Sequence, residues 1–175
     1  MKKDAAVVVN LSMSNQTAFN LFGLSVSLQL DLEKLDDAYR CAQNQVHPDR
    51  FVGKTPMEQS IAASQAILIN DAYQRLKSPL LRAQEILKSR NLSIPGDKGQ
   101  TIQHPSLLIE IMDLRERLNE STGTKELEIL RGELQGGIHQ IEEKFETLSD
   151  EDIVLSYLRY VYLVKLIEDA TSFTS

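Results

Sequence analysis

Apolar residues recur at intervals of three and four along two neighbouring segments, and this period predicts two amphipathic helices. The first segment follows Asp31, a residue type that caps helices, and ends before His47. The second begins after Thr55 and stops before Ser78. The expected packing faces are Leu32, Leu35, Tyr39, Ala42 and Val46 in the first helix and Met57, Ile61, Gln65, Leu68, Ile69, Ala72, Tyr73 and Leu76 in the second.

The segment between these helices is expected to form a stiff, exposed loop. Pro48 disfavours a helical conformation at His47 and cannot donate to the preceding turn, so the first helix must end there. Thr55, Pro56 and Glu58 combine a cap, a proline at the first helical position and an acid three residues after the cap, which together start a helix. Because a loop of about ten residues joins them, the two helices should pack antiparallel.

Further helices are expected on the carboxyl side of this hairpin. One starts at Ser78-Pro79 and ends near Asn91, before a turn-rich segment at residues 93–100 that marks a domain boundary. Three more are expected at about residues 105–120, 125–147 and 150–171, and these form a small antiparallel bundle. The sequence therefore predicts an all-α protein. Its expected parts are an amino-terminal tail (1–15), a hairpin domain with flanking helices (16–91), a linker (92–104) and a three-helix domain (105–175).

The middle helix of the three-helix domain contains an unusual number of glycines, namely Gly132 and the pair Gly136-Gly137. Each glycine costs on the order of 1 kcal/mol relative to alanine in a helix interior. We therefore expect a kink or a close helix approach at this place.

Two of the expected bundle helices carry more apolar surface than one packing face requires. The packing stripes are Leu107, Ile111, Leu114 and Leu118 in the first helix and Ile153, Tyr157, Tyr160, Val164 and Ile167 in the last; the second stripes are Leu108, Ile109 and Met112, and Leu155, Leu158, Tyr162 and Leu166. A second stripe either is covered by another element or meets a partner. We expect Leu108, Met112 and Tyr162 to form the apolar centre of a docking surface. Asp113 and Glu116 form its rim, which suits a partner with basic residues around a hydrophobic groove.

Charge is distributed unevenly along the chain, whose net charge is −6. Residues 1–90 contain eleven Lys and Arg against nine Asp and Glu, a net charge of +2, whereas residues 91–175 contain eight against sixteen, a net charge of −8. Because phosphate binding needs a clustered basic surface, the acidic second half argues against nucleic acid as a partner. With 42% apolar and 25% charged residues, the composition is that of a globular protein of one or two small domains.

The sequence offers little for metal or disulfide chemistry. Cys41 is the single cysteine, and the three histidines form no cluster with metal-ligand spacing, so we expect no metal, no cofactor and no internal disulfide. The apolar run near the amino terminus is shorter than a signal-peptide core, and no window approaches the roughly 20 apolar residues that span a membrane. We therefore expect a cytoplasmic protein without a membrane partner.

His47, Pro48 and Asp49 stand between the two predicted helices, and this region resembles the J-domain of DnaJ-type co-chaperones. The supporting residues are Tyr39-Arg40, Arg50-Phe51, Ile69-Asn70-Asp71-Ala72-Tyr73-Gln74-Arg75-Leu76, Ser78-Pro79 and Arg82-Ala83. The resemblance covers about residues 19–90, and it is specific because the triplet and the second-helix pattern occur together.

The order of the two domains resembles the HscB family, co-chaperones of iron–sulfur cluster assembly, in which a J-domain precedes a three-helix bundle. The bundle here contains Leu114-Arg115-Glu116-Arg117-Leu118. The resemblance implies that the triplet loop docks on a DnaK-type ATPase chaperone, HscA in this pathway, and promotes ATP hydrolysis while the bundle delivers the scaffold protein IscU. The implied scaffold-binding positions are Leu108, Ile109, Met112, Asp113, Glu116 and Tyr162.

Each residue of the triplet has an expected role at the chaperone. Asp49 supplies a carboxylate able to pair with an arginine, Pro48 holds the backbone, and His47 offers a hydrogen-bond donor. These groups would shift a conformational equilibrium in the partner rather than perform bond chemistry. An enzyme that uses His47 and Asp49 as an acid–base pair is disfavoured, because nothing nearby supplies a nucleophile and an exposed loop excludes no water.

The helix before the triplet departs from the family pattern, because J-domains generally carry several lysines and arginines there. This chain has Lys34 and Arg40 and then the neutral residues Gln43, Asn44 and Gln45. We expect weak electrostatic steering and a dedicated chaperone, with Gln43 and Asn44 replacing some charge pairs by hydrogen bonds. Two alternatives stay open: a J-protein for a different client, and a helical adaptor without a chaperone partner.

Overall fold

The computed structural model describes residues 17–93, 104–121 and 123–172. Within these ranges the chain forms helices and no strand, so the predicted all-α class is confirmed. The chain divides into two compact units, Met1–Ser89 and Arg90–Ser175. The predicted amino-terminal tail lies outside the described residues, and so does most of the predicted linker.

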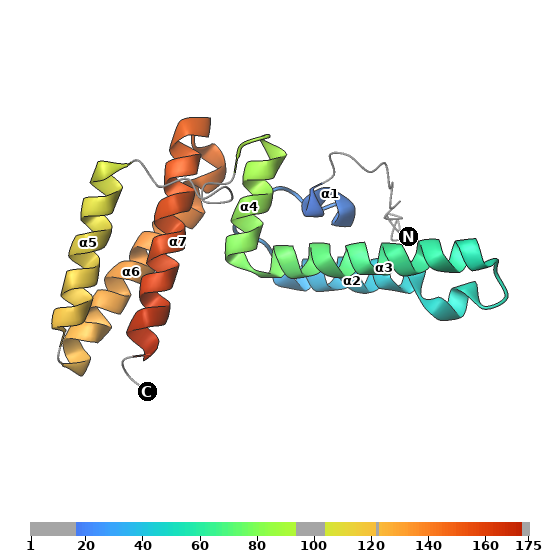
Figure 1. The fold of residues 1–175 in the computed structure, drawn as a ribbon, viewed down its shortest axis with the longest axis horizontal. Coiled ribbons are helices and arrows are strands. Elements are labelled where there is room, and N and C mark those ends of the chain that lie inside the picture. The colour runs from blue at the N-terminus through green and yellow to red at the C-terminus, as the bar shows by residue number, and fades with distance from the viewer. Residues whose placement is uncertain (1–16, 94–103, 122, 173–175) are drawn as a thin grey trace, which may run out of the picture. The chain divides into compact units, whose positions relative to one another are not determined.

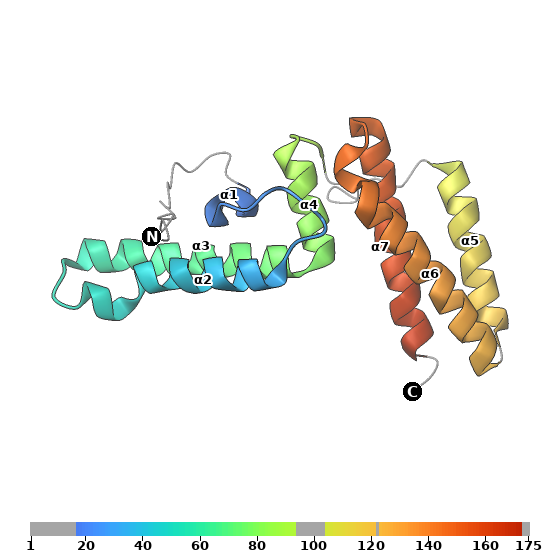
Figure 2. The same cartoon turned by 180° about the vertical axis from the view of Figure 1, so that it is seen from behind.

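The first unit is built on a pair of helices, α2 (Leu32–Val46) and α3 (Pro56–Lys77), which lie side by side (Figures 1 and 2). Both helix starts agree with the sequence. A carboxylate oxygen of Asp31 accepts the backbone N–H groups of Glu33 and Lys34, which caps α2. Thr55 and Glu58 form a reciprocal capping box at the start of α3.

Two shorter helices complete the first unit, α1 (Ala18–Phe22) and α4 (Pro79–Ser89). α1 packs against α2 and α3, and α4 packs against α3. Gly23 ends α1 with a φ of 64°, a left-handed conformation that glycine adopts without steric cost. The apolar core shared by the hairpin and α1 consists of Phe19, Phe22, Leu28, Leu35, Ala42, Val46, Ala62, Ile69, Ala72 and Leu76.

The predicted packing face of α3 is wrong in its first half. Met57 and Ile61 are 73% and 47% exposed, whereas Ala62 is buried; Leu68, in the second half of the helix, is 39% exposed. α3 has 22 residues and α2 has 15, so α3 is longer by about 10 Å at 1.5 Å per residue. The first turns of α3 therefore have no α2 beside them, and the buried stripe runs through Ala62 and Ile69 instead.

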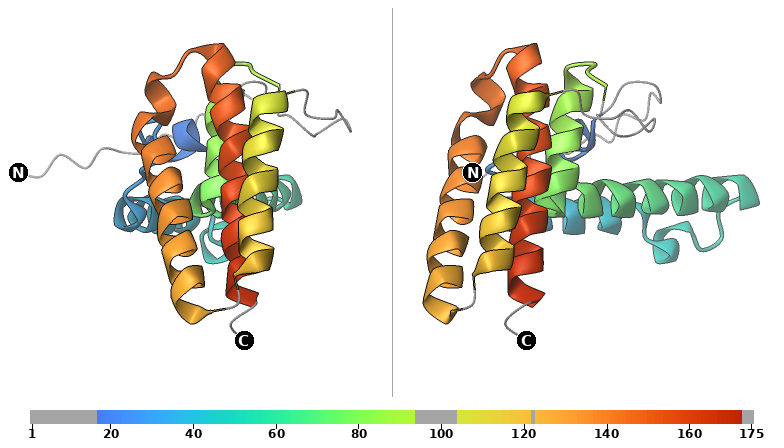
Figure 3. Two further views of the ribbon diagram at one scale, coloured as in Figure 1. Left: turned by 90° about the vertical axis from the view of Figure 1, so that its left-hand side faces the viewer. Right: turned by 60° about the vertical axis from the view of Figure 1, so that its left-hand side comes forward.

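The second unit contains α5 (Pro105–Glu120), α6 (Thr124–Lys144), a 3₁₀ turn η2 (Phe145–Thr147) and α7 (Asp150–Ser172). α7 packs against both α5 and α6, which gives the predicted three-helix arrangement (Figure 3). Its core consists of Leu107, Ile111, Leu118, Leu127, Leu130, Leu134, Ile141, Phe145, Ile153, Tyr157, Leu158, Tyr160, Leu163, Leu166 and Ala170. Because α7 meets two neighbours, its second stripe is largely covered: Leu158 and Leu166 are buried, and Leu155 and Tyr162 are half-buried.

The glycines of α6 allow a close approach rather than a break, since α6 is continuous from Thr124 to Lys144. A methyl group added at Gly137 would lie 3.2 Å from a terminal carbon of Leu163 on α7, which is tight. Gly132 and Gly136 have open space at the same position. Among the three glycines of α6, Gly137 is therefore the one that serves helix packing.

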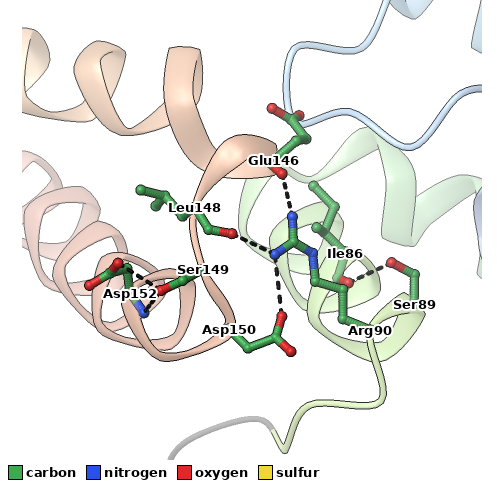
Figure 4. A network of polar contacts seen from close by, with 8 residues as sticks. All are labelled: Ile86, Ser89, Arg90, Glu146, Leu148, Ser149, Asp150 and Asp152. Atoms are coloured by element: carbon green, nitrogen blue, oxygen red, sulfur yellow. Dashed lines mark hydrogen bonds and ion pairs between the residues drawn. The ribbon is translucent and has the colours of Figure 1, made fainter.

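The connection from η2 into α7 is held by polar contacts around Arg90 (Figure 4). The guanidinium of Arg90 donates to the backbone carbonyls of Leu148, at 2.7 Å, and of Glu146, and it lies 3.4 Å from the Asp150 carboxylate. Ser149 caps α7 as the sequence predicts, because its hydroxyl accepts the Asp152 N–H. The turn before α7 is thereby fixed at its carbonyl groups as well as at its cap.

Candidate partner-binding surfaces

The predicted loop between α2 and α3 contains a short 3₁₀ helix, η1 (Pro48–Phe51), which packs against α3. Every residue of the His47-Pro48-Asp49 triplet is exposed, and the Asp49 side chain is 86% accessible to solvent. Pro48 occupies the first position of η1, where a missing N–H costs no hydrogen bond. The loop thus presents its carboxylate outward from a defined backbone.

His47 and Asp49 interact through one ring nitrogen. His47 Nδ1 lies 3.4 Å from the backbone nitrogen of Asp49 and 3.5 Å from its carboxylate oxygen Oδ2. A neutral His47 accepts the amide hydrogen, which caps η1, whereas a protonated His47 pairs with the carboxylate. The ring therefore holds the backbone of Asp49 in the first state and its carboxylate in the second.

Hydrogen bonds brace the triplet loop from both helices. Arg50 donates to the backbone carbonyl of Asn44 in α2 at 3.3 Å. Gln59 of α3 donates to the carbonyls of Phe51 and Lys54, both at 3.2 Å. A loop held at both ends loses little conformational freedom on binding, which favours recognition of its exposed side chains.

The residues predicted to extend this surface along α2 differ in their surroundings. Arg40 and Asn44 are exposed, and Arg40 lies 3.9 Å from Asp37. Gln43 is half-buried, and its side-chain nitrogen donates to Asn70 of α3 at 2.7 Å. At 100° per residue, Arg40, Gln43 and Asn44 lie within one third of the helix circumference, so α2 presents a single polar face.

The second predicted surface lies on α5. Leu108, Ile109 and Met112 are 56%, 68% and 62% exposed, as the surplus apolar stripe predicts. Asp113 and Glu116 are exposed on the same outward side of the helix. Three large apolar side chains in open contact with water, next to two carboxylates, have the composition of a binding surface rather than of an ordinary solvent-facing helix.

Two ion pairs show where Tyr162 lies relative to this surface. Arg159 of α7 contacts Glu110 of α5 at 2.7 Å, and Arg115 of α5 lies 3.8 Å from Asp169 of α7. The two helices therefore run parallel, and Tyr162 comes at the level of residues 110–115 of α5. Tyr162 is half-buried, because α7 packs against two helices, so it differs from the exposed Leu108, Ile109 and Met112 of α5.

The sequence did not reveal several contacts that order these surfaces. The bond from Gln43 to Asn70 joins residues 27 positions apart, and the pair of Arg159 and Glu110 joins residues 49 positions apart. Opposite charges on two helices predicted to be neighbours are the only local signal for the second contact. The first has no such signal, since both residues are neutral amides.

The described residues contain neither a metal-binding cluster nor a membrane-spanning helix. In residues 17–93, 104–121 and 123–172, no group of three histidine, cysteine, aspartate or glutamate side chains is arranged to hold a metal ion. Nor does the part of the chain that the structure describes contain a helix with the length and hydropathy of a membrane span.

A helical hairpin with an exposed His-Pro-Asp loop, followed by a separate three-helix unit, is the architecture of a two-domain J-domain protein. Residues 103–170 match the family described as the HSCB C-terminal oligomerisation domain. The chain is 46% identical over 105 residues to a co-chaperone protein HscB homolog of Aeromonas salmonicida, a match covering 60% of each chain. It is 42% identical over 102 residues to the homolog of Colwellia psychrerythraea, covering 58% of each. The chain thus spans about three fifths of the length of these curated relatives.

Two solved structures share the fold. The chaperone HscB from Vibrio cholerae superposes with a TM-score of 0.70 at 26% identity, covering 91% of this chain and 98% of that one. The human co-chaperone protein HscB superposes with a TM-score of 0.78 at 23% identity, covering 93% of this chain and 84% of that one. The family model, the curated relatives and the solved structures that this chain resembles are thus all HscB proteins.

Proposed function

We propose that this chain stimulates ATP hydrolysis by a DnaK-type chaperone, HscA, through the His47-Pro48-Asp49 loop. Its second unit would deliver the scaffold protein IscU to that chaperone during iron–sulfur cluster assembly. The observation that carries the proposal is the Asp49 carboxylate, which is 86% exposed on a loop braced from both α2 and α3.

The chemistry of the loop suits a switch contact. A carboxylate that is exposed in the free protein can pair with an arginine of the chaperone, and a charge-assisted hydrogen bond of this kind is among the stronger polar contacts. Desolvation of Asp49 is offset by that pairing only where the partner presents a matching cation, which makes the contact specific. The loop acts on the conformation of the ATPase, and the reacting atoms belong to the chaperone.

Replacing Asp49 with asparagine tests this part of the proposal. We expect D49N to weaken stimulation of HscA by about 10- to 100-fold at subsaturating protein, the range for one charge-assisted contact. The fold should be unchanged, because the side chain is exposed. The matched control is D71N, which makes the same change at an exposed position of α3 and should stimulate like the unaltered protein. Full stimulation by D49N would reject the role of the triplet.

The exposed apolar residues of α5 support the second part of the proposal. Leu108, Ile109 and Met112 offer the apolar centre, and Asp113 and Glu116 offer the acidic rim. Central apolar anchors typically carry about 1–3 kcal/mol each in a protein interface. The exposed fractions of these residues mean that truncating them removes little packing within the unit.

Calorimetric titration with IscU tests this surface. We expect the variant L108A/M112A to bind IscU at least about 30-fold more weakly, corresponding to two anchors of about 1 kcal/mol each. Adding Y162A should weaken binding further. The matched control is I129A, which truncates an isoleucine that is 55% exposed on α6. Unchanged affinity of L108A/M112A would favour a J-protein for a different client, provided that D49N still weakens stimulation of HscA.

A further inference from the structure

We infer that Asn70 is a positioning residue for the chaperone-binding face of α2, because it holds the side chain of Gln43 in place. The inference rests on the proposed function, since it assigns Gln43 to the surface that meets the chaperone. Asn70 itself lies on α3, outside the triplet loop and outside the residues predicted to contact the chaperone.

One oxygen atom of Asn70 gathers two donors from α2. Asn70 Oδ1 accepts the side-chain N–H of Gln43 at 2.7 Å and the hydroxyl of Tyr39, also at 2.7 Å. A carbonyl oxygen has two lone pairs, so the two bonds saturate it. Asn70 therefore binds Gln43 and Tyr39 at the same time rather than alternating between them.

Tyr39 and Asn70 are in turn held by a ladder of contacts along one edge of the hairpin. The ring of Tyr39 stacks on that of Tyr73, with centroids 4.2 Å apart and an interplanar angle of 25°. Tyr73 donates its hydroxyl hydrogen to Asp36 at 2.8 Å, and Lys77 donates to the hydroxyl oxygen of Tyr73 at 3.1 Å. The ladder joins positions 36, 39 and 43 of α2 to positions 70 and 73 of α3, and Lys77 extends it along α3, so Asn70 lies at its end nearest the triplet.

The hydrogen bond to Asn70 restricts the conformation of the Gln43 side chain. A glutamine on a helix surface has three rotatable side-chain bonds and loses rotamer entropy when a partner fixes it. The bond to Asn70 fixes the Gln43 side chain before a partner binds. It uses one of the two side-chain N–H groups, which leaves the second N–H and the carbonyl oxygen to face a partner. Gln43 is thereby presented as an ordered polar group between Arg40 and the triplet loop.

The same geometry separates positioning from stability. Asn70 is exposed, so removing its oxygen returns the Tyr39 and Gln43 donors to water instead of leaving a buried group unpaired. The stability of the free protein should therefore change little. Its affinity for the chaperone should fall, because Gln43 is no longer held in one conformation. Substituting a residue with a purely structural role would instead lower the stability of the free protein and leave its affinity for the chaperone unchanged.

The test compares substitutions at Asn70 in the full-length chain. N70L keeps the size of the side chain and removes the acceptor, whereas N70D keeps an oxygen acceptor at the same place. We expect N70L to raise the concentration that gives half-maximal stimulation of HscA by about three- to tenfold, the range of one hydrogen bond, with an unchanged maximum. N70D should restore the half-maximal concentration. The matched control is Q74L, which makes the same kind of change at an exposed amide of α3 outside the ladder.

A second measurement examines the free protein. The side-chain amide protons of Gln43, observed by NMR, should lose their hydrogen-bonded shift and their order in N70L and keep both in D49N. The inference is overturned if N70L stimulates like the unaltered chain, if N70D fails to restore the effect, or if the Gln43 amide is unchanged in N70L. The proposed function fails in a different way, namely if the unaltered chain does not stimulate HscA or if D49N stimulates it fully. Either of these results would overturn both the proposed function and the inference about Asn70.

Discussion

The backbone N–H of Ala18 donates to the buried carboxylate of Glu85 at 3.1 Å, across 67 positions of the chain. The same carboxylate accepts Arg75 at 2.7 Å and Lys88 at 3.0 Å. Glu85 thus ties α1 to α4 and brings both to α3 through one side chain that is almost fully buried. Because two cations and one amide converge on it, its removal leaves several donors without an acceptor.

Replacing Glu85 with glutamine should lower the free energy of unfolding of the first unit by about 1–3 kcal/mol. Glutamine keeps one acceptor oxygen and loses the charge that balances Arg75 and Lys88. Urea unfolding followed by circular dichroism measures the change. The control E33Q alters an exposed glutamate of α2 and should stay within about 0.5 kcal/mol. Equal stabilities of E85Q and E33Q would contradict the anchoring role.

Acid should weaken this anchor. Burial raises the pKa of Glu85, but the hydrogen bonds from Ala18, Arg75 and Lys88 outweigh it, so the pKa lies below the usual value of 4.5. A carboxyl that is more acidic in the folded state stabilises fully above its unfolded pKa and loses that contribution as the pH falls through the folded value. The stability difference between the unaltered protein and E85Q should therefore be constant from pH 7 to about 5 and shrink below 4.5. A difference that stays constant down to pH 3 would argue against the pKa shift.

Glycine substitutions in α6 should have opposite effects according to the space around them. G132A and G136A should each raise the free energy of unfolding by about 0.5–1 kcal/mol, because alanine favours the helix and open space receives the methyl group. G137V should lower it by about 1–3 kcal/mol, because Leu163 stands 3.2 Å from the added carbon and is itself buried. Thermal unfolding of the three variants side by side checks this order, and a stabilised G137V would be inconsistent with the close approach.

The capping box formed by Thr55 and Glu58 should stabilise the first turn of α3. T55A removes the hydroxyl that accepts the Glu58 N–H, and the loss of such a cap costs about 1 kcal/mol. Hydrogen exchange should show the greatest loss of protection in the first turn of α3. The control S60A removes a hydroxyl from an exposed interior position of α3 and should leave that protection unchanged. Loss of protection spread evenly along α3 would point to global rather than local destabilisation.

The boundaries of the helices could be predicted because they depend on local chemistry. Asp31, Thr55 and Ser149 each bond to backbone groups two or three residues away, so a short stretch of sequence contains the whole interaction. The surplus apolar stripe of α5 was visible for the same reason, since its period is fixed by the helix alone.

Burial of particular side chains depended on elements far along the chain. Met57 and Ile61 have the spacing of a packing face, but α2 is too short to cover them. Tyr162 is half-buried because α7 serves two neighbours, a property that the period of α7 does not contain. The charged anchor at Glu85 and the link from Asn70 to Gln43 join residues from separate helices, so neither follows from a local pattern.

The unequal lengths of α2 and α3 determine how a protein can reach Asp49. Because α2 ends first, the opening turns of α3 continue beyond the end of α2, and η1 packs against α3 (Figure 1). A molecule that pairs with the Asp49 carboxylate therefore meets a loop with a helix alongside it, and the volume of α3 is closed to that molecule.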